Sequence, residues 1–474
     1  MSAALRRLVV LAALAGVLAA CAPRLPPAPP TLTDIAVPTD RVSGNPAVSI
    51  APGLDPAWWR MFGSASLDHA LDRALASNPD LAEASARIEA AAAQMVVAGA
   101  AREPHVDSAA KVTAVQQSDY GDHGIYNGQG YVVADLAPFT LSYRLDLFGH
   151  DAEVVAGAEA RREMARARAA QATLALRAAV VKTCVGLDLA GRLLENQRVL
   201  VTLAERRVEV ARAARAAGVA APASVPPYER AAADARARAA DQGARVRALG
   251  YALAALLGEG PDTALPCGNG DSTLPAAIGL PARIDLEALA RRPDIAFALW
   301  QVRAREHDRA AARLAFYPNL DLRALIGLND IGLGDLLKAG SFTYAIAPAL
   351  SLPLFDGGLR EGNFEAANAE HAAAIHAYNR TVLNAARDVA SLLAELDRGH
   401  ATLGERAHAL DALQSELGAA RAALAAGTAA EQPTLDAEVA ERTAYGALLA
   451  EQLHWVDTLT DTATALGGGL PTDS

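Results

Sequence analysis

An internal repeat is the feature that most constrains how this chain can fold. One helical stretch begins at Pro79 and ends at Pro104, and a second begins at Pro293 and ends at Pro318. The two prolines have the same spacing in both stretches, and an aspartate follows the second proline at the same position in each. This self-similarity predicts two copies of one structural plan rather than a single irregular core.

Each copy contains a long helical run in which an aliphatic residue recurs at every seventh position. These residues are Val180, Leu187, Leu194, Val201 and Val208 in the first copy, and Val389, Leu396, Leu403, Leu410, Leu417 and Leu424 in the second. A sustained heptad is typical of helices packed side by side in coiled-coil fashion. The composition agrees, because the chain is 52% hydrophobic but only 5% aromatic, with alanine supplying much of the total.

The two runs predict helices of unusual length, roughly 150–217 and 357–426, each without an interior proline. At 1.5 Å per residue, each helix would be on the order of 100 Å long. The runs stop at Gly218 and Gly427, because glycine readily adopts the left-handed conformation that ends a helix. Shorter helices are expected at about 66–103, 228–257, 285–317 and 434–466.

Four other segments alternate apolar and polar residues with a period of two. They lie at about 105–112, 139–147, 319–328 and 341–352. Alternation over about ten residues between turn-rich loops is typical of outer-membrane strands, and a half-buried strand of a soluble sheet is the alternative. Four strands cannot close a barrel wide enough for a channel, so membrane strands would require several chains to contribute four each.

The N-terminus has the pattern of an export signal. Arg6 and Arg7 precede an apolar run at 8–20, which is too short to span a bilayer but suits a secretory signal peptide. The run ends in Ala19-Ala20-Cys21, which resembles the lipobox of bacterial lipoproteins, whose cysteine is acylated. A proline-rich tether follows, and Ala22 is not an aspartate, which favours the outer membrane in such lipoproteins.

The remaining cysteines, Cys184 and Cys267, have no spacing typical of a metal site. The sequence favours an inert buried thiol at Cys184. A disulfide between the two in an oxidising periplasm is the alternative.

The chemistry of an enzyme is not found in the sequence. There is no nucleophile elbow and no metal pair. His371 and His376 are five residues apart, which does not place both rings on one helix face, so we expect both at the surface. The glycine-rich stretch 258–270 has no following Lys-Ser/Thr, so it fits a linker better than a phosphate site. The net charge of −11 argues against nucleic acid as a partner.

With these features in place, the chain resembles the TolC-like outer-membrane efflux family, and within it the NodT-type lipoprotein branch. The motifs that carry the resemblance are Trp58-Trp59-Arg60-Met61-Phe62, Leu145-Asp146-Leu147-Phe148-Gly149, Leu352-Pro353-Leu354-Phe355-Asp356-Gly357-Gly358, and Gly427 with Leu435-Asp436-Ala437. Together with the lipobox and the repeat, they cover nearly the whole mature chain.

The resemblance implies a mainly α fold with a minor β part. A homotrimer would build a twelve-stranded outer-membrane β-barrel from four strands per chain, continued by a long periplasmic α-helical coiled-coil barrel. The implied partners are a periplasmic adaptor, an inner-membrane transporter and outer-membrane lipid, with no cofactor beyond the covalent lipid on Cys21. The expected divisions are a signal peptide at 1–20, a tether at 21–57, the first repeat at 58–260, a linker at 261–283, the second repeat at 284–466 and a tail at 467–474.

The same resemblance points to sites at the two hairpin tips. Asp436 lies in a context similar to the family's pore-lining position and Glu431 is close by, so both are candidate gate residues, although acids near a helix start can simply stabilise its dipole. Adaptor contacts are expected at Gly218, Gly427 and Thr428. The first tip departs from the family pattern, because prolines replace the usual aspartate there.

The function expected from these features is an outer-membrane channel of a tripartite efflux system that exports small toxic compounds. A duct for type I protein secretion would use the same architecture and remains the alternative. A purely structural coiled-coil tether is disfavoured, because a tether needs no membrane strands.

Overall fold

The computed structural model describes residues 30–32, 44–120 and 124–469. The lipobox and Cys21 lie outside the described residues. The elements follow the order β1 (Val48–Ile50), η1 (Trp58–Phe62), α3 (Ala65–Ser77), α4 (Pro79–Ala100), β2 (His105–Gln116), η2 (Gly124–Tyr126), β3 (Gly130–Leu145), α5 (His150–Ala216), η3 (Pro222–Ser224), α6 (Pro226–Leu256), β4 (Ile278–Leu280), α7 (Leu286–Leu289), α8 (Pro293–Leu314), β5 (Asn319–Ile331), η4 (Ala339–Ser341), β6 (Phe342–Ser351), α9 (Leu359–Ala425), α10 (Glu431–Ala465) and η5 (Gly467–Gly469). The predicted mainly α fold with a minor β part is confirmed.

The chain forms two compact units, and each draws on both halves of the sequence. Unit 1 contains 88–165 and 298–378, and unit 2 contains 33–87, 166–297 and 379–474. The two long helices, α5 and α9, contribute residues to both units. None of the described helices contains an apolar stretch long enough to cross a membrane.

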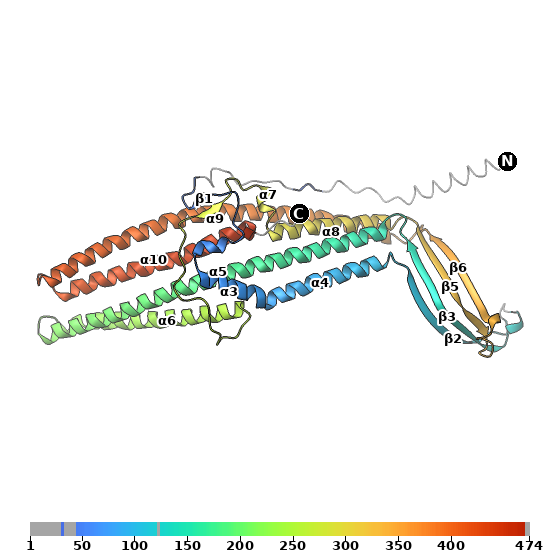
Figure 1. Cartoon of the computed structure of the whole chain (residues 1–474), viewed down its shortest axis with the longest axis horizontal. Helices are drawn as coiled ribbons and strands as arrows, with labels where there is room; N and C mark the ends of the chain where they lie inside the picture. Colours follow the sequence, from blue (N-terminus) through green and yellow to red (C-terminus); the bar gives the residue numbers. More distant parts are fainter. Residues whose placement is uncertain (1–29, 33–43, 121–123, 470–474) are drawn as a thin grey trace. The chain divides into compact units, whose positions relative to one another are not determined.

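Unit 1 holds a four-stranded antiparallel sheet in the order β2-β3-β5-β6 (Figure 1). All four strands were predicted from alternation, and three of them extend beyond the predicted ranges. The central strand β3 contains Pro138, which has no N–H to donate to a ladder. The pairing with β5 is irregular at that point, between Leu136 and Phe139. Gly327 lies opposite, and a Cβ there would stand 2.6 Å from the carbonyl oxygen of Leu136, so only glycine fits this approach.

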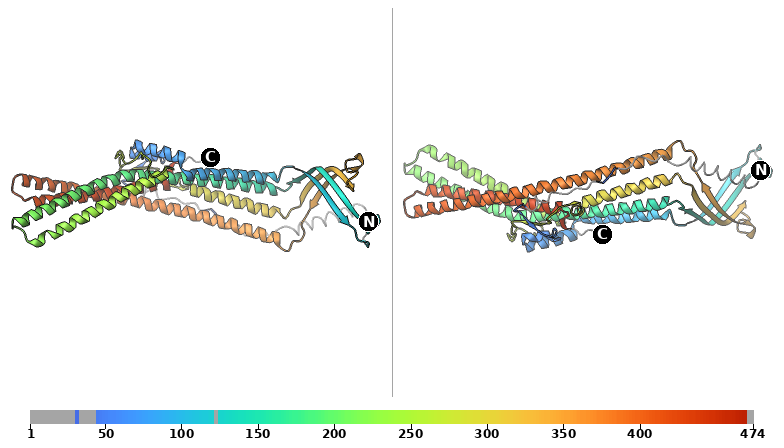
Figure 2. Two further views of the ribbon diagram at one scale, coloured as in Figure 1. Left: turned by 90° about the horizontal axis from the view of Figure 1, so that it is seen from below. Right: turned by 90° about the horizontal axis from the view of Figure 1, so that it is seen from above.

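Unit 2 is built on two helical hairpins, α5–α6 and α9–α10, in which the helices run side by side (Figure 2). The predicted long helices at 150–217 and 357–426 are confirmed as α5 and α9. Gly218 and Gly427 have φ values of 73° and 69°, the left-handed conformation expected for a helix stop. The amide of the next residue bonds back to the helix in both cases, at 3.0 Å. The two copies therefore end their long helices in the same way.

The heptad residues lie in the helix seams. Val180, Val208, Leu396, Leu410 and Leu417 are buried, and the exposed fraction of Leu410 is 8%. These positions confirm the heptad interpretation, because the apolar stripe of each long helix is covered by its neighbours.

The shorter helices before the sheet differ from the prediction. Single helices were expected at about 66–103 and 285–317, but the structure has α3 and α4 in the first copy and α7 and α8 in the second. Asn78 is extended, with ψ of 125°, because the ring of Pro79 disfavours the helical conformation of the preceding residue. The Asn78 side chain then accepts a hydrogen bond from the Asp80 amide at 2.9 Å and caps α4.

The cysteine prediction was wrong. Cys184 is not a free buried thiol but forms a disulfide with Cys267, across a sequence separation of 83 residues. The small parallel sheet of β1 and β4 was also not predicted, because each strand has three residues and shows no periodicity.

Candidate channel surface and gate

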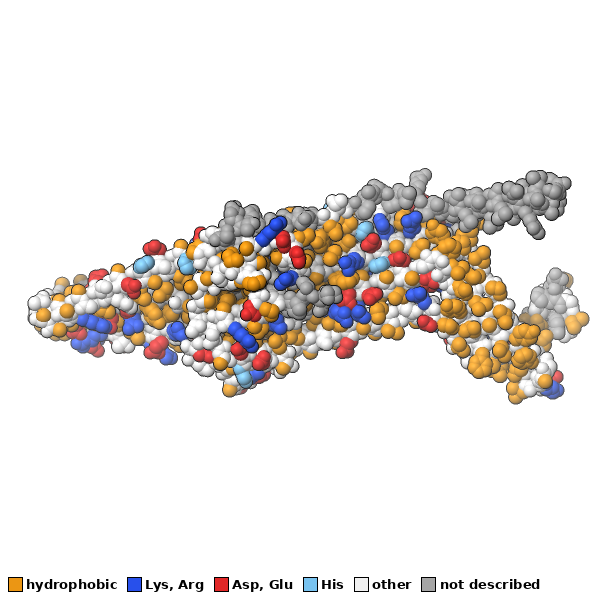
Figure 3. Space-filling view, turned by 45° about the horizontal axis from the view of Figure 1, so that its top comes forward, with side chains coloured by type: hydrophobic (Ala, Val, Ile, Leu, Met, Phe, Trp, Pro, Cys, Tyr) orange, Lys and Arg blue, Asp and Glu red, His pale blue; other side chains and the backbone are white. Residues whose placement is uncertain are grey.

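The sheet of unit 1 has one continuous apolar face. Paired positions such as Phe139, Ile326 and Tyr344 lie in one row across three strands. The apolar residues on this face are Val106, Ala110, Val112, Ala114, Val132, Ala134, Leu136, Phe139, Leu141, Tyr143, Leu145, Leu320, Leu322, Ala324, Ile326, Leu328, Phe342, Tyr344, Ile346, Pro348 and Leu350. Asp330, opposite Ala134, is a charged residue near the end of the same face. Many of these side chains are exposed, and hydrophobic surface gathers over the strands in Figure 3. A face of this composition fits lipid.

The opposite face of the sheet carries most of its polar side chains together with small residues, and the larger apolar residues on it include Val133, Leu325 and Ile331. Arg144 on β3 lies 3.5 Å from Asp321 on β5, and Asn329 donates a hydrogen bond to Asp135. β6 presents small residues on this face, including Ala345, Ala347 and Ala349. The two faces therefore differ in the way that a lipid-facing and a water-facing surface should.

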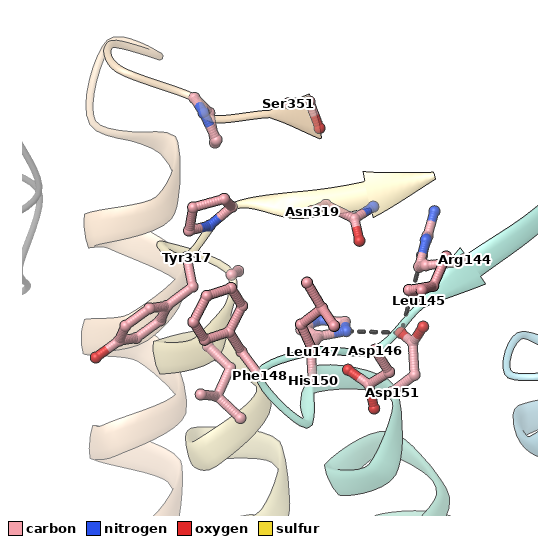
Figure 4. A pocket seen from close by; sticks show the side chains of 14 residues that line it. Arg144, Leu145, Asp146, Leu147, Phe148, His150, Asp151, Tyr317, Asn319 and Ser351 are labelled. Carbon is pink, nitrogen blue, oxygen red and sulfur yellow. Dashed lines mark hydrogen bonds and ion pairs between the residues drawn. The ribbon is translucent and has the colours of Figure 1, made fainter. Parts of the chain in front are cut away.

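The sheet passes into α5 through a polar junction that surrounds a cavity of about 200 Å³ (Figure 4). Asp146 caps the helix by accepting a hydrogen bond from the Ala152 amide at 2.8 Å. Asp151 is buried, lies 2.8 Å from His150 and 3.8 Å from Arg144, and lines the cavity with them. The Leu145–Gly149 motif thus joins strand to helix, as the sequence indicated.

The candidate gate residues lie at the start of α10 and pair with α5. The Glu431 carboxylate is 2.7 Å from the Arg206 guanidinium, and the Asp436 carboxylate is 2.6 Å from that of Arg207. Arg206 donates hydrogen bonds to Glu431 and to Glu209, and these bonds raise the pKa of Arg206 above its ordinary value. Both pairs join the first hairpin to the second. Nothing in the sequence pattern indicated that these two arginines would be the partners of the candidate gate acids.

The environment of the two acids differs. Glu431 is in the first turn of α10, where a carboxylate also stabilises the helix dipole. Asp436 is beyond that turn, and Arg207, which holds it, also stacks over the ring of Tyr228 at 5.1 Å. Stabilisation of the helix dipole therefore accounts for the position of Glu431 better than for the position of Asp436.

The hairpin tips expose the residues predicted to meet an adaptor. Gly218, Gly427 and Thr428 are all exposed. The hydroxyl of Thr428 donates a hydrogen bond to the Ala423 carbonyl at 3.0 Å, so it closes its own turn. The proline-rich first tip forms the short helix η3, and its neighbour Val219 is 79% exposed.

The linker between the copies is fixed to α5 in unit 2. Besides the Cys184–Cys267 disulfide, the buried Asp188 accepts hydrogen bonds from the Gly270 amide at 3.1 Å and from the Ser272 side chain. Nothing in the sequence pattern indicated that this linker would be held at two adjacent turns of α5.

The prediction that both histidines of α9 lie at the surface was half wrong. His376 is exposed, but the exposed fraction of His371 is only 5%. Burial lowers the pKa of His371, and the neighbouring Arg309 adds to this. His371 is therefore a packed residue of unit 1.

A comparison with known protein families identifies the family to which this chain belongs. The family described as outer membrane efflux protein matches residues 70–259 and 286–468, one segment for each copy of the repeat. The chain belongs to the outer membrane efflux protein family. It is an outer-membrane efflux channel protein, and the family resemblance inferred from the sequence motifs is confirmed.

Individual relatives agree with this assignment. The fusaric acid resistance protein FusA of Burkholderia cepacia is 31% identical over 348 residues, which cover 70% of this chain and 61% of that protein. The outer membrane protein OprJ of Pseudomonas aeruginosa is 30% identical over 91% of this chain and 90% of its own. The crystal structure of the outer membrane protein VceC from Vibrio cholerae superposes with a TM-score of 0.79 at 26% identity, covering 88% of this chain and 99% of that one.

Proposed function

We propose that three copies of this efflux channel protein assemble into one duct. The observation that carries the proposal is the sheet of unit 1, which has a lipid-compatible face, a polar face and outer edges on β2 and β6 with no partner strand among the described residues. An open edge in a membrane leaves backbone groups without hydrogen bonds, which costs several kcal/mol per group. Three sheets of four strands would close a twelve-stranded barrel and satisfy every edge.

The cargo we propose is small toxic compounds delivered by a periplasmic adaptor and an inner-membrane transporter. The name of the relative FusA, a resistance protein for fusaric acid, supports a small-molecule cargo. The exposed tips at Gly218, Gly427 and Thr428 would meet the adaptor, and a lipid on Cys21 would add a second attachment to the outer membrane.

At the tips, the ion pairs Arg206–Glu431 and Arg207–Asp436 would hold the two hairpins together in a narrowed state. Threefold symmetry would repeat the carboxylates around one axis, where they would attract cations and repel anions at short range. The pairs are half-exposed, so the closed state would be only modestly favoured and adaptor binding could open it.

The test of cargo uses a strain that lacks the gene. Loss of the channel should raise intracellular accumulation of small antibiotics and dyes several-fold, and the wild-type gene should restore export. If accumulation does not change but a secreted protein is retained in the cell, the duct serves type I secretion instead. Native mass spectrometry of the detergent-solubilised protein tests assembly, and a stable monomer would contradict the proposed duct.

A further inference from the structure

Unit 2 contains a groove with a volume of about 710 Å³, lined by residues of α5, the first turn of α8, α9 and the end of α10. Arg292, just before α8, donates a hydrogen bond to the Ala465 carbonyl at 3.0 Å, so α8 begins where α10 ends. Both lie between α5 and α9 (Figure 1). A groove of this size is within the range of small-molecule sites, about 300–1,000 Å³.

Much of the lining of this groove is apolar and made of small side chains. α5 contributes Ala175, Ala178 and Ala179, and α9 contributes Leu392. Ala175 is exposed and the other three are partly exposed, so this surface is open to a ligand. An apolar body that covered these residues would remove apolar surface from water, which favours binding.

Both cations that line the groove pair with carboxylates. Arg292 donates two hydrogen bonds to Asp294, at 3.0 and 2.8 Å. The Lys182 ammonium lies 2.7 Å from Asp461 and 3.9 Å from Asp457. One positive charge is therefore shared by two carboxylates, and negative charge is left in excess on the α10 side of the groove.

The α9 side of the groove adds another carboxylate, Asp388. Its neighbour Arg387 donates two hydrogen bonds, and both go to Oδ1 of Asp388. The Arg387 side chain is 69% exposed and is not part of the lining, so water and salt screen its charge. The groove therefore combines apolar surface with an excess of negative charge, which is complementary to a ligand that has an apolar body and one positive charge.

The groove lies on the side of unit 2 that faces away from the linker. Lys182 and Cys184 are two residues apart on α5, which places them about 200° apart around the helix, and Cys184 is bound to the linker by the disulfide. On α10, Trp455 donates a hydrogen bond to the linker carbonyl of Pro275 at 2.9 Å, and Asp457, which approaches Lys182, is again two residues away. In the duct proposed above, the linker would lie on the outside, because additional chain on the inside would obstruct the passage. The groove would then face the passage.

We propose that this groove is a transient binding site for amphipathic cations on their way through the duct. The proposal rests on the function proposed above, and it names one class of compound that the passage would accept. The apolar body would lie against the alanines of α5 and Leu392, and the positive charge would lie between Asp388 and Asp461. The binding would be weak, which suits a passage, because a compound that is held tightly cannot leave.

Binding of two fluorescent probes to the full-length protein in lipid nanodiscs tests the proposal. Ethidium is an aromatic cation, and anilinonaphthalene sulfonate is an amphipathic anion. Ethidium should bind saturably above the background of empty nanodiscs, and the anion should bind much more weakly. Asp388→Asn should weaken ethidium binding by up to about fivefold, as expected for a half-exposed charge contact. Lys182→Gln should strengthen it by a similar factor, because Asp457 and Asp461 lose their shared cation.

Asp397→Asn is the matched control, because Asp397 is an exposed carboxylate of α9 that does not line the groove. It should leave ethidium binding unchanged. The gain expected for Lys182→Gln cannot come from unfolding, which would destroy the groove. Absence of ethidium binding, equal binding of both probes or equal affinities of all the variants would overturn the site, while a trimer that still exports small compounds would leave the duct standing. If the protein is a stable monomer, the duct fails and with it the role of the groove in a passage, whatever the groove binds.

Discussion

Arg207 on α5 and Asp436 on α10 lie 2.6 Å apart, although they are more than two hundred residues apart in the chain. With the parallel pair of Arg206 and Glu431, this contact joins the two hairpins near their tips. A carboxylate that was expected to face a pore thus has a cationic partner within its own chain. In the function proposed above, this pair would hold the two hairpins together in the narrowed state.

Removing either member of the Arg207–Asp436 pair should open the duct at rest. In planar bilayers, Arg207→Ala and Asp436→Ala should both raise single-channel conductance, but only Asp436→Ala should reduce cation preference and block by multivalent cations. The double variant should resemble Asp436→Ala, because the two residues act through one contact. Unchanged conductance and selectivity in Asp436→Ala would make the residue a purely structural one.

Loss of the disulfide should destabilise the protein without changing its fold. In the chain-entropy description, a bridge closing a loop of 83 residues contributes about 4.5 kcal/mol. Cys184→Ala with Cys267→Ala should therefore lower the thermal midpoint by several degrees, and reduction of the wild-type protein should do the same. The double variant itself, treated with reductant, is the control and should not shift further. Equal midpoints for wild type and variant would contradict a structural role for the bridge.

The heptad seam gives a third prediction. Leu410→Asp would place an unpaired charge in a position that is 8% exposed, at an expected cost of several kcal/mol. We expect loss of the assembled trimer and increased proteolysis of the second hairpin. Ala407→Asp introduces the same charge at an exposed position of the same helix and should be tolerated. Equal behaviour of the two variants would show that the seam is misassigned.

The Glu395 carboxylate on α9 should make the stability of the fold depend on pH in the acidic range. Hydrogen bonds from Arg398 and then His454 lower the pKa of Glu395 to about 2, from an ordinary value of 4.5. Because the folded-state pKa is depressed, the stabilisation is fully present above about pH 4.5 and is lost as the pH falls toward 2. Glu395→Gln should be less stable than wild type at pH 7, and the difference in thermal midpoint should disappear by about pH 2. A difference independent of pH would mean that the ion pairs do not cause it.

Acylation at Cys21 is the last prediction. Cys21→Ser should mature poorly or mislocalise, yet keep partial export activity behind a different signal peptide, because an assembled barrel would hold the protein in the membrane without its lipid. Mass spectrometry of the mature N-terminus is the direct measurement. An unmodified cysteine on the mature protein would contradict the lipoprotein assignment.

The sequence alone was sufficient for the two long helices, the four strands of the unit 1 sheet and their order along the chain. Local patterns predict the extents of α5 and α9, the helix-terminating glycines Gly218 and Gly427, and the four strands of the sheet. A helix stop needs only one residue that tolerates positive φ, and a strand or helix shows its exposed face through its own periodicity. These signals are local, so they can be read without knowing what the element packs against.

Only the tertiary structure decided which distant residues meet. Cys184 and Cys267 form a disulfide because the linker folds back onto α5. Asp436 pairs with Arg207 because the hairpins of the two repeats lie side by side within one chain. His371 is buried by its neighbours in unit 1, although nothing in its local sequence distinguishes it from the exposed His376. A periodic pattern fixes the face of a helix but not the neighbour that covers it, because that choice depends on packing free energies summed over the whole chain.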